Sequence, residues 1–231
     1  MLALRSVFLT AAGLATMTAP LLAGGSPPEF GNVCIQDYQG GAVCTANDVR
    51  FESFTPIQVL EGCTEGTPGE ATIVFEVVVS ADGSPDRYDI GMFIALDGGS
   101  ALTGDDCFHD YLDPPLTTTP VYGDANGNGV PDIVDGPWWD GEAPLGGADT
   151  CGDMETNTEV IKTLVALTVT CVDTNDDGIV DVSACASWDN QVSNNCSTVQ
   201  GAFPGTPSKC SCVRLETGAE IPVELIGLTV E

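Results

Sequence analysis

The chain has 231 residues, of which 43% are hydrophobic, and its formal net charge is −28 at pH 7. This apolar content is typical of a globular protein with one sizeable domain or two small ones. The excess of 34 acidic over 6 basic residues argues against nucleic acid and anionic membranes as partners, because both are bound through Lys and Arg. It favours a protein that binds divalent cations, which would relieve the repulsion between its own charges.

Residues 1–25 have the pattern of a secretory signal peptide: one basic residue, an apolar run, and then small residues. We expect cleavage between about Ala23 and Ser26. A membrane anchor is the alternative, but Gly13 and Pro20 interrupt the apolar run. We therefore expect a secreted, extracellular protein without membrane insertion.

Strands are predicted at 71–80, 87–95 and 160–171 from the alternation of apolar residues and the density of Val, Ile and Thr. Shorter candidates are 48–54, 57–60, 209–215 and 221–230, and no amphipathic helix stands out. The residues expected to share one face within each of the three longer strands are Ile73, Phe75, Val77 and Val79, then Tyr88, Ile90, Met92 and Ile94, and then Ile161, Val165, Leu167 and Val169.

The region from about 98 to 158 is rich in Gly, Pro and Asp and has little periodicity. Loops of this length are uncommon in compact domains unless they are functional or disordered. We therefore expect a loop insertion that is ordered by something other than a hydrophobic core.

The stretch YGDANGNGVPDIVDG within this region has the spacing of a twelve-residue calcium loop. Oxygen side chains stand at positions 1, 3 and 5, glycine at the bend, a backbone carbonyl at 7, and oxygens at 9 and 12. A solvated acidic turn is the alternative, since Asn, Asp and Gly also favour turns. The predicted ligands of this first and stronger Ca²⁺ site are Asp124, Asn126, Asn128, Val130, Asp132 and Asp135.

A second stretch, DTNDDGIVD, repeats the pattern. Its position 12 is Ala184, so the last ligand is missing or comes from elsewhere in the chain. The predicted ligands of the second Ca²⁺ site are Asp173, Asn175, Asp177, Ile179 and Asp181.

Both loops resemble the calcium loops of thrombospondin type 3 repeats, dockerins and EF-hands. The phrases CTANDVRF, RYDIGMFIA, CVDTNDDGIVDVSACASWDN and PGTPSKCSC resemble those of Cys-rich extracellular β-domains of bacterial surface and adhesin-like proteins. This second resemblance spans most of residues 34–215 and implies an adhesive role.

An even number of cysteines in an exported chain predicts a disulfide framework, with reduced or metal-binding thiols as the alternative. The fold class predicted is all-β: a disulfide-stapled antiparallel β-sandwich over 26–218, with the calcium-ordered loop at about 98–158. The cysteines, all beyond the signal peptide, are Cys34, Cys44, Cys63, Cys107, Cys151, Cys171, Cys185, Cys196, Cys210 and Cys212.

No catalytic pattern emerges, and we expect no enzyme. The single histidine, His109, has no nucleophile motif beside it, and a carboxylate-based hydrolase is the last of three hypotheses. Trp138 and Trp139 follow the first loop as either a hydrophobic plug or a ligand-binding platform.

The apolar, β-prone run in 219–231 is either the last strand of the sandwich or a donor strand for a second copy of the chain. Our leading hypothesis is a secreted calcium-binding structural protein, adhesin-like or assembling with itself into a surface fibre, whose other partners would be surface proteins or glycans. The alternative is a carbohydrate- or protein-binding module that uses the tryptophan pair.

Overall fold

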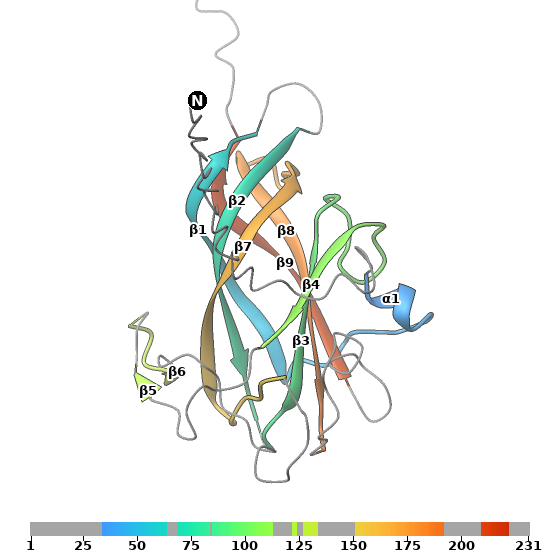
Figure 1. The fold of residues 1–231 in the computed structure, drawn as a ribbon, viewed down its shortest axis with the longest axis vertical. Helices are drawn as coiled ribbons and strands as arrows, with labels where there is room; N and C mark the ends of the chain where they lie inside the picture. Colours follow the sequence, from blue (N-terminus) through green and yellow to red (C-terminus); the bar gives the residue numbers. More distant parts are fainter. Residues whose placement is uncertain are drawn as a thin grey trace, which may run out of the picture.

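The computed structural model describes residues 34–63, 69–83, 85–112, 122–123, 127–133, 151–191 and 209–221. These residues form two β-sheets and one four-residue helix, α1 (Ile35–Tyr38) (Figure 1). In this part of the chain, no helix has the length and apolar character needed to cross a membrane. The predicted signal peptide and most of the C-terminal run lie outside the described residues.

The two sheets face each other and enclose the main core, which confirms the predicted antiparallel β-sandwich (Figure 1). Every strand pair is antiparallel except β6 with β7. The five-stranded sheet has the order β1 (Val49–Glu61), β2 (Glu70–Ala81), β7 (Thr158–Thr170), β6 (Asp132–Ile133) and β5 (Tyr122–Gly123). The four-stranded sheet has the order β4 (Cys107–Tyr111), β3 (Tyr88–Ala95), β8 (Ile179–Asp189) and β9 (Lys209–Glu220).

Alternation correctly predicted the core face of β2. Ile73, Phe75, Val77 and Val79 are all completely buried. Successive side chains of a strand point to opposite faces, so these four line one face of the sheet and pack toward the other sheet.

The face of β7 was predicted wrongly for Ile161 and Val165. Ile161 is only partly buried, between two buried neighbours. Val165 is 54% exposed, whereas Leu164 is 3% exposed. The pairing of β2 with β7 shifts register between Val74 and Glu76. The extra β7 residue at this bulge inverts the alternation that a regular strand would keep.

Four strands, β4, β5, β6 and β8, were not predicted. β8 begins with branched residues, but Ser183, Ala184 and Ala186 follow, and this second half has a low strand propensity. β4, β5 and β6 lie inside the region expected to be a loop insertion, of which much falls outside the described residues. The candidates 48–54 and 57–60 join into the single strand β1.

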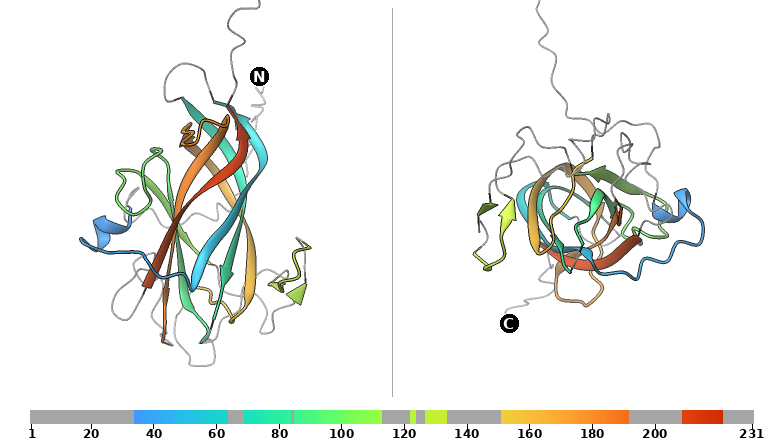
Figure 2. Two further views of the ribbon diagram at one scale, coloured as in Figure 1. Left: turned by 180° about the vertical axis from the view of Figure 1, so that it is seen from behind. Right: turned by 90° about the horizontal axis from the view of Figure 1, so that it is seen from below.

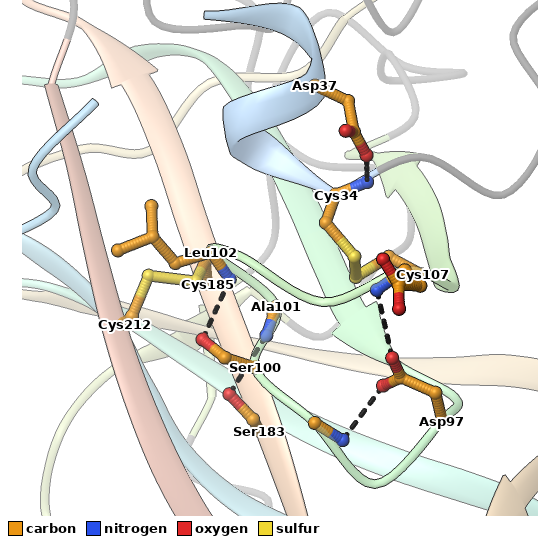
Figure 3. Close-up of a disulfide and its surroundings, with 12 residues drawn as sticks. Cys34, Asp37, Asp97, Ser100, Ala101, Leu102, Cys107, Ser183, Cys185 and Cys212 are labelled. Atoms are coloured by element: carbon orange, nitrogen blue, oxygen red, sulfur yellow. Dashed lines mark hydrogen bonds between the residues drawn. A yellow bond between two sulfur atoms is a disulfide. The ribbon is translucent and has the colours of Figure 1, made fainter. Parts of the chain in front are cut away.

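A second, smaller core lies where α1 covers the four-stranded sheet. Phe93 is completely buried there, so β3 is buried on both faces. Figure 3 shows Cys34, at the start of α1, bonded to Cys107 at the start of β4, and Asp97 holding the loop before β4 by accepting hydrogen bonds from its backbone.

The predicted disulfide framework is confirmed for the described cysteines. Cys151 is disulfide-bonded as well, and Cys196 lies outside the described residues. Such a framework is typical of an oxidising, extracellular environment. The four described bonds are Cys34–Cys107, Cys44–Cys210, Cys63–Cys171 and Cys185–Cys212.

The sandwich is closed along one side, where β1 and β9 lie beside each other (Figure 2). Ser211 Oγ donates a hydrogen bond to the Val49 carbonyl, and Gly218 lies against Pro56. The opposite side is formed by β7 and β4, which belong to different sheets and are not paired with each other in the part of the chain that the structure describes.

Candidate calcium sites

The second acidic loop connects β7 to β8, and its backbone is organised by the carboxylate of Asp173. This carboxylate accepts hydrogen bonds from the N–H groups of Gly178 at 2.7 Å, Asp177 at 3.2 Å and Asn175 at 3.3 Å. The Gly178 hydrogen bond is the largest factor that lowers the pKa of Asp173 below its ordinary 3.8, with further hydrogen bonds from the loop acting in the same direction. Asp173 is therefore ionised at neutral pH.

The two acidic loops have the same local backbone conformation at two positions. Position 4 has a positive φ in both, +75° at Gly127 and +60° at Asp176. Position 6 is glycine in both, with φ +87° at Gly129 and +87° at Gly178. Glycine adopts this left-handed conformation readily, and Asp tolerates it better than most residues. The repeated sequence spacing therefore folds into a repeated turn.

The second loop brings two carboxylates together around the amide of Asn175. Its Nδ2 donates to Asp177 Oδ2 at 3.1 Å and to Glu216 Oε1 at 3.0 Å. Glu216 comes from β9, where it is paired with Asp181 of β8. The sequence prediction did not include Glu216, because 41 residues separate it from Asn175 and only the strand pairing places it here.

The amide N–H₂ group of Asn175 lies between two anions, where a cation would also be attracted. A half-turn of this amide would present its oxygen instead, giving three oxygen ligands from Asn175, Asp177 and Glu216. Calcium–oxygen bonds of about 2.3–2.6 Å require ligand oxygens no more than ~5 Å apart. The two hydrogen bonds hold the carboxylate oxygens within ~6 Å, so a small inward movement would suffice.

Calcium binding at this loop therefore requires the amide to turn and the carboxylates to close in. Among the residues that the structure describes, no group of three or more His, Cys, Asp or Glu side chains already has an arrangement that could hold a metal ion. The donors that the loop offers are nevertheless all hard oxygens, which is the ligand type that calcium prefers.

Two more predicted ligands, Asp181 and Ile179, make hydrogen bonds to other residues of the same loop in this structure. Asp181 is 4% exposed, and its Oδ2 accepts hydrogen bonds from the Thr174 N–H at 2.7 Å and from the Thr174 hydroxyl. The Ile179 N–H donates to Asp177 Oδ1 at 2.9 Å. An open groove of about 470 Å³ lined by Asn175 and Glu216 gives solvent access to the loop.

Of the first loop, the structure describes only residues 127–133. Asn128 Oδ1 accepts a hydrogen bond from the Val130 N–H at 2.7 Å, and Asn128 Nδ2 donates to Glu159 Oε2 at 2.8 Å. Glu159 is 5% exposed on β7, and its N–H donates to the Pro131 carbonyl at 2.9 Å. In each loop an asparagine thus contacts a glutamate from a strand, and in neither loop did sequence spacing identify that glutamate.

Several predicted site residues lie wholly or partly outside the described residues. Of Asp132, the structure describes the backbone, in β6. Those outside the described residues are Asp124, Asn126, Asp135, Trp138 and Trp139.

His109 lies in a packed position on β4. It is 7% exposed, and its ring packs edge-on to Tyr38 with centroids 6.4 Å apart. Burial, with a smaller effect from the charge of Asp37, raises the pKa of Tyr38 to about 12.

Comparison of the chain with protein-family models, curated proteins and solved structures gave no match. The resemblance to Cys-rich extracellular β-domains therefore stays a prediction.

Proposed function

We propose that the protein is a secreted calcium-binding structural protein, adhesin-like or assembling with itself at a cell surface. The observation that supports this proposal best is the second loop, where Asn175 lies between the carboxylates of Asp177 and Glu216. The matching backbone of the first loop supports a second site of the same kind.

Calcium in these loops would act as a structural cross-link. Glu216 joins the second loop to β9, and Glu159 joins the first loop to β7, so each ion would tie a loop to a strand distant in sequence. In a chain with a net charge of −28, bound calcium also relieves repulsion. Within the described residues both loops adjoin strands, and neither is flanked by the helices that a calcium sensor moves.

The proposed partner is a second copy of the chain, bound through the C-terminal run in 219–231. This run begins at the second loop, because the Ile221 N–H donates to the Gly178 carbonyl at 2.7 Å. Calcium at the loop would therefore fix the point from which the C-terminal run departs. The alternative function rests on Trp138 and Trp139, and no described contact favours it.

Thermal unfolding tests the calcium proposal. Calcium at a hundredfold excess over its dissociation constant stabilises a protein by about 2.7 kcal/mol per site. For a chain of this size each kcal/mol raises the Tm by about 2–4 °C, so each occupied site should raise it by roughly 5–10 °C. Sodium chloride at matched ionic strength is the control. An identical melting curve in calcium and in excess EDTA would contradict the proposal.

A further inference from the structure

A groove of about 520 Å³ lies on the open side of the sandwich, between β7 and β4. Leu96, Phe108, Val165 and Leu167 give it an apolar lining. Near one end of the groove, the Thr170 N–H donates a hydrogen bond to the Leu96 carbonyl at 2.7 Å and so connects the two sides. Beyond the other end, Lys162 Nζ donates to the Tyr111 carbonyl at 2.9 Å and lies 2.8 Å from Asp110 Oδ2.

Between these two connections β7 has a free edge. Apart from Leu164 and Val165 at the bulge, residues 163–169 are paired with β2 on one side, while β6 pairs with β7 only at Glu159 and Val160. Within the described residues, no backbone group pairs with the other side of 163–169. An open edge with an exposed apolar side chain, here Val165 at 54%, is a template for another strand.

Asp106 gives a second, independent indication that the groove lacks a partner. It lines the groove, and its Oδ1 is buried without any hydrogen bond from the described residues. Buried acceptors are rarely left unsatisfied in folded proteins. Because Oδ1 is closed off from solvent, a backbone N–H of an added strand would satisfy this oxygen after the Asp106 carboxylate turns toward the groove.

We infer that this groove is the acceptor site for the segment 224–230 of a second copy of the chain. The inference rests on the self-assembly part of the proposed function. In an extended segment, Ile226, Leu228 and Val230 share one face, so they would enter the apolar groove together. The seven residues of this segment match the length of the free edge at 163–169.

The position of β9 favours a second copy over the chain's own segment. β9 lies beside β1 and β8, on the side of the sandwich away from the groove. To reach the groove, the chain after Ile221 would cross about three strand spacings, or ~15 Å, which takes roughly five residues. Ile226 would then still lie outside the groove, whereas a segment donated by a neighbour has no such limit.

Two single substitutions in the full chain separate the donor from the acceptor. Leu228→Glu places a charge on the donor face, and Val165→Lys places one on the rim of the groove, at a side chain exposed enough to keep the fold. Val43→Lys is the matched control, because Val43 is 74% exposed and does not line the groove. Sedimentation of calcium-loaded protein at high concentration measures the assembly state of each.

We expect the unsubstituted chain and Val43→Lys to assemble, and each of the other two variants to remain monomeric. A mixture of Leu228→Glu and Val165→Lys should give dimers and nothing larger, because only one productive pairing remains. A monomeric unsubstituted chain would overturn both the inference and the self-assembly proposal. Assembly that survives Val165→Lys would overturn the acceptor site alone, and the EDTA melting curve reports on calcium separately.

Discussion

The substitution Glu216→Gln tests whether β9 supplies the carboxylate that the second loop lacks at position 12. Glu216 is exposed, so its replacement should leave the β-sandwich intact. Glutamine keeps the shape and one oxygen but removes the charge 3.0 Å from Asn175 Nδ2. We expect calcium binding at this loop to weaken while the fold is retained.

The size of the effect follows from Coulomb's law. A carboxylate oxygen about 2.4 Å from Ca²⁺ attracts it by ~3.5 kcal/mol at the dielectric constant of water, which suits this exposed loop. Glutamine would keep part of the interaction through its carbonyl oxygen. The expected loss is therefore about 1.4–2.7 kcal/mol, which corresponds to a 10- to 100-fold weaker affinity.

Isothermal titration with calcium measures this loss. Glu61→Gln is the matched control, since it removes the same charge from an exposed position at the end of β1. Weaker calcium binding in Glu216→Gln but not in Glu61→Gln would support Glu216 as a direct calcium ligand. Equal weakening in both variants, or none in either, would refute the assignment of Glu216.

Three further predictions concern the loop and the sandwich. Hydrogen bonds to the ionised Asp173 stabilise the loop above pH ~3.8, and this stabilisation should be lost as the pH falls through the lowered pKa of the folded state. An NMR titration of the Gly178 amide should therefore show a midpoint below pH 3.8. A midpoint at or above 3.8 would contradict the prediction. Gly178→Ala and Gly83→Ala should each lower the free energy of unfolding by about 1–2 kcal/mol, because both glycines have a left-handed φ and an added Cβ would meet no atom. Only Gly178→Ala should also weaken calcium binding. Equal calcium affinities of the two variants would count against a site at the loop. Lys162→Met should lower the free energy of unfolding, measured with denaturant, by about 3–5 kcal/mol, because it removes the ammonium group that lies against the largely buried carboxylate of Asp110. A loss below ~1 kcal/mol would show that this ion pair does not stabilise the fold.

The sequence predicted those features that depend on residues close together in the chain. β2 alternates large apolar residues, so its core face could be read directly. The two loops share a spacing of Asp, Asn and Gly, and they share positive φ values at the same positions. β8 was not predicted, because its Ser and Ala residues become strand only through pairing with β3 and β9.

The contribution of Glu216 could not be predicted, because it depends on a long-range register. Cys185 is paired with Cys212 across β8 and β9, and the same register, continued along both strands, sets Asp181 opposite Glu216. Once this disulfide is known, counting four residues along each strand identifies Glu216. The cysteine spacing alone left the pairing open, so that step required the structure.

Anomalous diffraction from crystals grown in calcium would test the central claim most directly. The proposal predicts a calcium peak within about 2.3–2.6 Å of the carboxylates of Asp177 and Glu216, with the amide oxygen of Asn175 turned toward it. No peak at the second loop, with the Asn175 amide nitrogen still bridging the two carboxylates, would contradict it.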